Sequence, residues 1–225
     1  KEDYLGYENQ MLNNYSMFYF NDMMRKIMLS IMMPKYIAQQ NEAKAIMLAG
    51  MASESLRTLT QYRQYAKEHP YLKNQNIDFY TDLFSSLEIL PIESIIEYSR
   101  KLKSGGDTKF ERFLLSNCYK NEDYLNEIIA TRYMRIEAFE EAITYLSAID
   151  TSYDQTLYIF CYFDHDPFNE PYFGTKYITP APGYKLRYAT RMLDLQRTLT
   201  MVVDPVIRSY ATYHYGQGLM RAVTD

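Results

Sequence analysis

The chain has 225 residues, of which 47% are hydrophobic and 23% are charged, and its formal net charge is −4. This length can bury a sizeable core as one large domain or two small ones. The acidic balance argues against nucleic-acid binding, which needs a concentrated basic face. Eight glycines and eight prolines are too few for a sandwich or barrel of many short strands and turns.

An amphipathic helix is predicted over residues 11–33, where apolar and polar residues fall on opposite stripes. The apolar stripe consists of Phe18, Met24, Met28, Ile31 and Met32. Seven of the thirteen methionines lie in this segment, which suits an irregular core or, alternatively, an adaptable binding surface. No membrane span is expected here, because the segment contains Asn21, Asp22, Arg25 and Lys26. We expect Pro34 to end the helix, since proline disfavours α-helical geometry in the residue before it.

Three more helices are expected before residue 105. Residues 42–67 are rich in helix-forming residues, and His69-Pro70 should end that helix. A second helix is expected over residues 77–87. Pro91 suits the first turn of the third helix, and Ser104-Gly105-Gly106 should end it because glycine readily takes the left-handed conformation. The face of this third helix consists of Ile92, Ile95, Ile96, Ser99 and Leu102.

The helix after residue 106 carries the first of two cysteines. Asp107 is expected to cap it, and its inward face is predicted to be Phe110, Phe113, Leu114 and Cys118. Cys118 would then be a core thiol rather than a reactive one. Whether Cys118 pairs with Cys161 is left open by the sequence, although the absence of Cys-x-x-Cys argues against a metal knuckle.

Helical periodicity continues to residue 163. Asn121 is expected to cap a helix whose inner face is Leu125, Ile128, Ile129 and Tyr133. The next helix is predicted to bury Phe139, Ala142, Ile143, Leu146 and Ile149. Ser152 with Gln155 resembles a capping box, so the run TLYIFCYF that follows is expected to be a buried helix.

An irregular loop is predicted over residues 164–183, which contain four of the eight prolines. A loop of this length inside a compact domain is often functional. Periodicity returns with Tyr188, Met192, Leu195, Leu199 and Val202. Asp204-Pro205 should begin a last helix, whose apolar residues are Val206, Tyr210, Tyr213 and Met220.

Residues 125–150 (LNEIIATRYMRIEAFEEAITYLSAID) resemble a tetratricopeptide unit, in which two antiparallel helices approach each other through small residues. Ile129 and Ala130 match the large–small pair of the first helix. Tyr133 matches its aromatic position, and Ala142 and Leu146 match the small and bulky positions of the second helix. The chain departs from this pattern at Ala130, which replaces glycine, and it has no closing proline.

A second resemblance covers roughly residues 75–225. The segments EDYLNEIIATRYMRIEAFEEAITYLS, a DPF loop and YKLRYATRMLDLQ are similar to helical-repeat proteins of the cell envelope of Bacteroides-type bacteria. The resemblance implies a secreted or surface-anchored, extracytoplasmic protein, and it brings no reaction and no catalytic residue. Because the chain starts at Lys1 rather than Met, we expect a processed or truncated product, with any signal peptide upstream.

The expected fold is therefore all-α, a tetratricopeptide-like right-handed superhelix of antiparallel helical hairpins. We expect one helical-repeat domain over residues 1–225. Within it, residues 1–70 would form an N-terminal hairpin, and residues 75–225 would form the tetratricopeptide-like repeats.

The stretch CYFDHDPFNEPYFG (161–174) is the strongest candidate for chemistry. A hydrolase or metal site at Asp164, His165 and Asp166, with Glu170 nearby, is a remote alternative, because the side chains of consecutive residues diverge. The simpler interpretation is that these residues end a helix and shape a turn, or contact a bound ligand. We predict no catalytic, metal-binding or cofactor-binding residue and no enzymatic activity.

Tyrosine is unusually abundant, with 24 residues against no tryptophan, and most are assigned to contacts between helices. Tyrosine also suits protein contacts and stacking on sugar rings. The candidate ligand-binding residues are Tyr162, Asp164, His165, Asp166, Tyr172, Phe173, Tyr177 and Tyr184. The leading hypothesis is a non-enzymatic scaffold that binds a protein or peptide partner in the cell envelope, and the alternative is an aromatic-lined glycan-binding surface protein.

Overall fold

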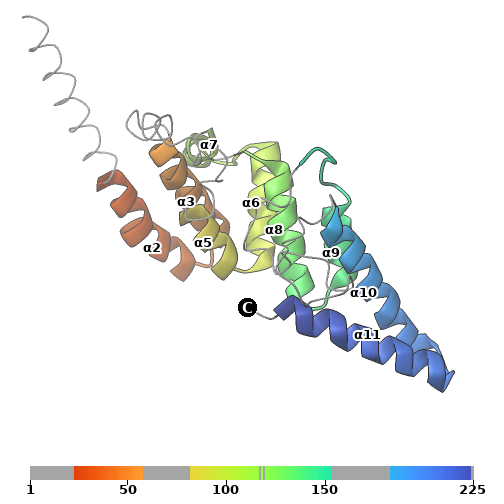
Figure 1. Cartoon of the computed structure of the whole chain (residues 1–225). Coiled ribbons are helices and arrows are strands. Elements are labelled where there is room, and N and C mark those ends of the chain that lie inside the picture. The colour runs from red at the N-terminus through yellow and green to blue at the C-terminus, as the bar shows by residue number, and fades with distance from the viewer. Residues whose placement is uncertain (1–22, 58–81, 117, 119, 154–182, 224–225) are drawn as a thin grey trace, which may run out of the picture. The chain divides into compact units, whose positions relative to one another are not determined.

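The computed structural model describes residues 23–57, 82–116, 118, 120–153 and 183–223 (Figure 1). These ranges are helices joined by short turns and contain no strand, which confirms the predicted all-α class. The chain divides into two compact units, Lys1–Lys120 and Asn121–Asp225. Within the described ranges, no helix combines the length and the apolar character that crossing a membrane requires.

The first described helix continues through Pro34, so the prediction that this residue ends it is wrong. Residues 23–27 are α-helical, Met28–Met32 form a π-helical segment (η1), and Met33–Ala38 form α2 with Pro34 in its first turn. Inside an α-helix, a proline has no N–H to donate and its ring clashes with the carbonyl four residues earlier. The wider π-helical turn just before Pro34 relieves that clash, so the helix proceeds to Ala38.

The first unit is organised around one central helix. After α2, the helices among its described residues are α3 (Glu42–Arg57), α5 (Asp82–Ile89), α6 (Ile92–Ser104) and α7 (Lys109–Ser116). The helices α2, α5, α6 and α7 each pack against α3. The predicted helix over 42–67 is thus confirmed as far as residue 57, and the remainder lies outside the described residues.

The sequence of α3 explains why other helices pack around it, because small and aliphatic residues are mixed along its buried surface. Its buried residues are Ala43, Ala45, Ile46, Met47, Leu48, Ala49 and Ala52. At Gly50, an added Cβ would lie 3.0 Å from the Sγ of Cys118 and 3.0 Å from the hydroxyl of Tyr98, so neighbours sit directly on the helix backbone. Cys118 is 6% exposed and its Sγ lies 3.2 Å from the carbonyl oxygen of Met47, which confirms the predicted core thiol.

The connection between α6 and α7 matches the prediction in part. Gly105 ends α6 with a φ of 82°, as expected. The cap of α7 is Thr108 and not Asp107, because the Thr108 hydroxyl accepts the N–H of Glu111 at 3.1 Å and the Glu111 carboxylate accepts the N–H of Thr108 at 3.3 Å. With α7 beginning at Lys109, Leu114 is buried while Phe113 is 54% exposed.

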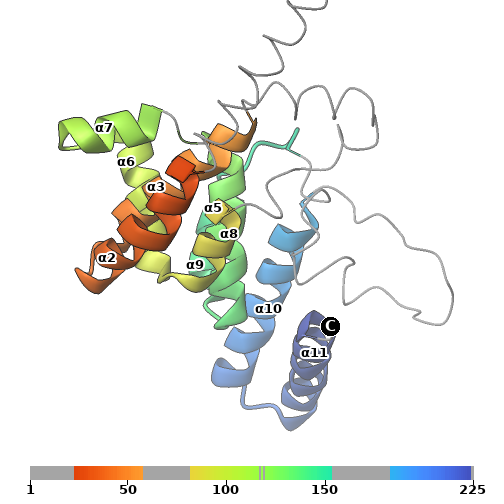
Figure 2. The same cartoon turned by 90° about the vertical axis from the view of Figure 1, so that its left-hand side faces the viewer.

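The described residues of the second unit form two helical hairpins in succession. Its helices are α8 (Glu122–Arg135), α9 (Phe139–Leu146), α10 (Tyr184–Met201) and α11 (Pro205–Val223). α8 pairs with α9 and α10 pairs with α11, and α10 also packs against α9. Figures 1 and 2 show α10 and α11 joined by a short turn. Both predicted caps are confirmed: the Asn121 side chain accepts the N–H of Tyr124 at 3.0 Å, and that of Asp204 accepts the N–H of Val206 at 2.8 Å.

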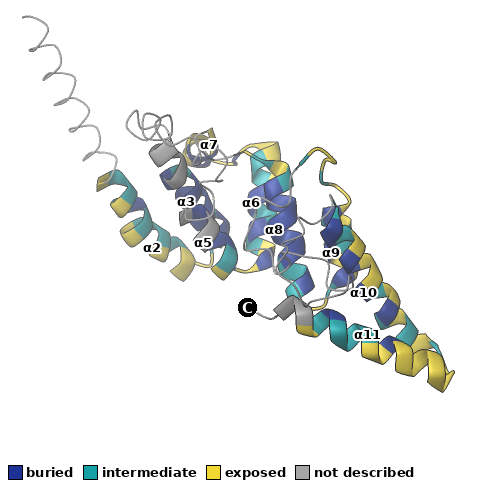
Figure 3. Ribbon diagram, in the orientation of Figure 1, coloured by how far each residue is buried: buried dark blue, intermediate teal, exposed yellow. Residues whose placement is uncertain are grey.

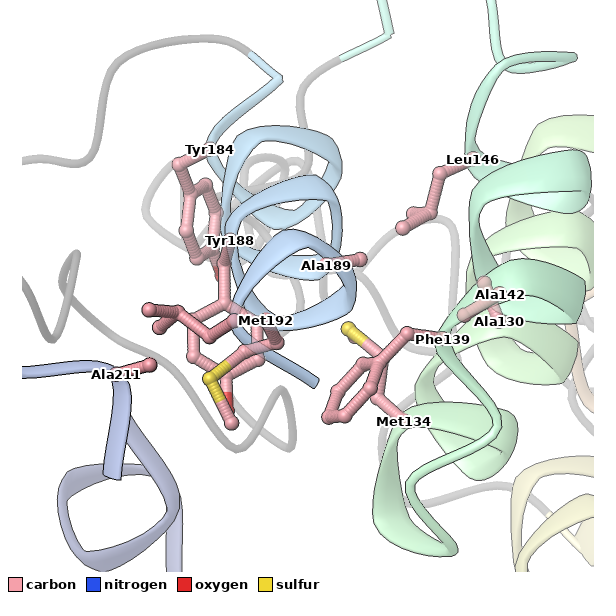
Figure 4. Packing of buried hydrophobic residues seen from close by; sticks show 11 residues of the cluster. Ala130, Met134, Phe139, Ala142, Leu146, Tyr184, Tyr188, Ala189, Met192 and Ala211 are labelled. Carbon is pink, nitrogen blue, oxygen red and sulfur yellow. The ribbon is translucent and has the colours of Figure 1, made fainter. Parts of the chain in front are cut away.

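The core of the second unit lies mainly between α9 and α10 (Figure 4). Its buried residues are Ala130, Met134, Phe139, Ala142, Leu146, Tyr184, Tyr188, Ala189, Met192, Leu195 and Ala211. Ala130 and Ala142 are fully buried, so α8 and α9 can approach closely. The rings of Phe139 and Tyr188 meet edge to face with their centroids 6.3 Å apart. α10 therefore joins the first hairpin to α11.

Candidate functional site

One face of α11 is held in place by the rest of the second unit. On this face Ala211 is 1% exposed and Gly218 is buried, so α11 can lie close to α10. The hydroxyl of Tyr188 donates to the carbonyl oxygen of Gly218 at 3.3 Å. The hydroxyl of Tyr215 donates to the carboxylate of Glu137 at 2.6 Å, in the turn between α8 and α9. Burial, and then this hydrogen bond, raise the pKa of Tyr215 above its usual range, so its hydroxyl stays protonated as a donor.

The opposite face of α11 is apolar and exposed to solvent (Figure 3). We call it the α11 stripe and define it as Val206, Tyr210, Tyr213 and Met220, which are 76%, 55%, 67% and 72% exposed. The sequence identifies these four as the apolar residues of the last helix, and the structure places all of them on the side that does not face α10. Met201 and Val203, at the turn between α10 and α11, are also exposed.

The ring of His214 contacts the rings of two tyrosines of the α11 stripe. The ring of His214 lies 4.2 Å from that of Tyr210 and 5.2 Å from that of Tyr213, measured between centroids. The Nδ1 of His214 is 3.2 Å from the side-chain oxygen of Gln217, one turn further along. These contacts restrict the rings before any partner arrives, so less conformational entropy is lost on binding.

The charge of this hairpin differs from that of the chain. Residues 184–223 contain six basic and two acidic residues, whereas the whole chain has 24 basic and 28 acidic ones. Within α11 there is no acidic residue. The carboxylate of Asp204, just before α11, already accepts the N–H groups of Val206 and Ile207. Lys185 is buried and Arg197 lies 3.3 Å from Glu140, so the basic count of this hairpin does not describe the surface beside the α11 stripe.

Most of the predicted ligand-binding residues cannot be placed. Seven of them lie outside the described residues: Tyr162, Asp164, His165, Asp166, Tyr172, Phe173 and Tyr177. The eighth, Tyr184, begins α10, and its ring is 2% exposed within the core (Figure 4). Tyr184 therefore has a packing role here and does not form part of an exposed surface.

A buried ion pair in the second unit was not predicted. Lys185 is 0% exposed and its Nζ pairs with the carboxylate of Glu127, which is 1% exposed. The same Nζ lies 3.2 Å from the hydroxyl of Thr131, and the hydroxyl of Tyr153 donates to Glu127 at 3.0 Å. A signal was present in the sequence, because Lys185 precedes Ala189 by four residues and Met192 by seven and so shares their buried face. The pair joins α8 to α10.

A second cluster of charge lies in the first unit. The Glu111 carboxylate, 5% exposed, is 3.2 Å from the Nζ of Lys44 and 3.3 Å from that of Lys101. It also accepts the N–H groups of Asp107 and Thr108. Burial alone would raise the pKa of Glu111, but the hydrogen bonds from both lysines and from these N–H groups outweigh burial and lower the pKa to about 2. This cluster ties α7 to α3 and α6.

The described residues contain no group of three or more histidine, cysteine, aspartate or glutamate side chains placed to hold a metal ion. In both clusters of buried charge, acidic side chains pair with amines and connect helices. The α11 stripe is instead a set of exposed aromatic and apolar side chains on one helix face. A scan against protein-family models, a search of curated proteins and a search of solved structures all give no match to this chain.

Proposed function

We propose that this chain is a non-enzymatic helical scaffold that binds a protein or peptide partner. The observation that carries the proposal is the α11 stripe, in which four large apolar side chains are each more than half exposed. Contiguous apolar surface of this kind on a soluble protein marks a site of interaction. Tyrosine and methionine are also enriched where proteins meet.

The strength of such a contact can be estimated from the side chains. Full burial of one large apolar side chain stabilises a complex by roughly 1.5–3 kcal/mol. The four residues of the α11 stripe could thus supply about 6–12 kcal/mol before the cost of association, which is estimated at 4–15 kcal/mol. A partner that covers the stripe alone would bind weakly, so the proposal requires further polar contacts beside it.

The arrangement of the second unit supports a tetratricopeptide-like scaffold as part of the proposal. Two hairpins follow one another, and α10 packs against α9 of the hairpin before it. Ala130 and Ala142 are both 0% exposed at the contact between α8 and α9. Small residues at this contact let the two helices approach closely, as they do in tetratricopeptide repeats. The right-handed superhelix and the extracytoplasmic location rest on the resemblance of the sequence to cell-envelope helical-repeat proteins.

Glycan binding is the second candidate, because two exposed tyrosine rings lie one turn apart on α11. Aromatic rings of this kind can stack on sugars. Two observations favour a protein partner instead. The tyrosines are flanked by Val206 and Met220, which offer nothing to sugar hydroxyls, and α11 contains no carboxylate to accept hydrogen bonds from them.

The proposal is tested by placing a photo-crosslinking amino acid at residue 213, in the α11 stripe, and in a matched control at residue 190. Thr190 is an exposed residue of α10 outside the stripe. Irradiation in a cell-envelope extract should give a discrete protein adduct at residue 213 and none at residue 190. Adducts at neither position would overturn the proposal. An oligosaccharide panel that changes the tyrosine fluorescence of the natural chain, but not of a Tyr210→Ser, Tyr213→Ser variant, would favour the glycan candidate.

A further inference from the structure

We draw no further inference here: the strongest candidate, the exposed apolar face of α11 that the α11 stripe forms in the second unit, carries none, because nothing in the structure shows what covers it.

Discussion

Replacing Lys185 with methionine should strongly destabilise the second unit. The substitution keeps the length of the side chain but leaves the carboxylate of Glu127, which is 1% exposed, without the amine that pairs with it. Removing one partner of a buried ion pair costs about 3–5 kcal/mol, because the remaining charge stays out of water and loses its paired amine. The lost contact from Lys185 to the Thr131 hydroxyl belongs to the same polar cluster and adds to the effect.

The matched control is Arg197→Met, which removes an exposed ion pair between α10 and α9. Arg197 lies 3.3 Å from Glu140, and their side chains are 51% and 74% exposed. Solvent screens such a pair, so the control should lose less than about 1 kcal/mol.

The assay is urea-induced unfolding followed by circular dichroism, for both single substitutions and for the pair Glu127→Leu with Lys185→Met. The double variant should be more stable than Lys185→Met alone, because it no longer buries an unpaired charge. If Lys185→Met costs no more than Arg197→Met, or if the two substitutions of the pair are simply additive, the reasoning about this buried pair is refuted.

Four further predictions concern other sites. Glu111 has a pKa of about 2 in the folded chain, below its ordinary 4.5. Its ion pairs therefore stabilise the first unit fully above pH 4.5, and this stabilisation is lost as the pH falls toward 2. Glu111→Gln should flatten that part of an acid-unfolding curve. Gly106→Ala should destabilise the first unit by about 1–3 kcal/mol, since its Cβ would lie 2.4 Å from the Cβ of Glu111. Gly216→Ala should instead raise the melting temperature, because a Cβ at this place in α11 meets nothing within 4 Å and alanine favours a helix. Asn121→Ala should cost about 1 kcal/mol in thermal unfolding by removing the cap of α8, whereas an unchanged melting temperature would contradict the role of that cap.

The sequence predicts the helices well where local chemistry determines them. Gly105, Asn121 and Asp204 end or begin helices at the predicted places. The side chains of Asn121 and Asp204 accept backbone N–H groups of their own helix, and Gly105 takes a positive φ that glycine allows. The burial of Cys118 also follows from local periodicity. The prediction that Pro34 ends its helix fails because the π-helical segment before Pro34 changes the backbone next to the proline ring.

Predictions that depend on register or on tertiary contacts are less reliable. A capping box at Thr108 begins α7 one residue later than an Asp107 cap would. The buried face of α7 carries Glu111, Leu114 and Leu115, and Phe110 and Phe113 are exposed. Hydrophobic periodicity shows that Val206, Tyr210, Tyr213 and Met220 share a face, but it does not show whether another helix covers that face. In the structure the buried residues among the described part of α11 are the small ones, Ala211 and Gly218, with Tyr215 and Leu219 partly buried against the same core.

The candidate site therefore combines a feature visible in the sequence with one that only the fold provides. The apolar residues of α11 could be identified from their spacing. Their exposure depends on Ala211 and Gly218, which let the other face of the helix approach α10. In the same way, the pairing of Lys185 with Glu127 joins residues 58 positions apart and could not be found from either helix alone.

The most direct measurement for the central claim, that the α11 stripe faces solvent, is oxidative footprinting of the tyrosines of the free chain, read by mass spectrometry. In the free chain, Tyr210 and Tyr213 should react quickly, while Tyr184 and Tyr188, each 2% exposed, should react slowly. Reaction of Tyr210 and Tyr213 as slow as that of Tyr184 and Tyr188 would contradict a solvent-facing α11 stripe.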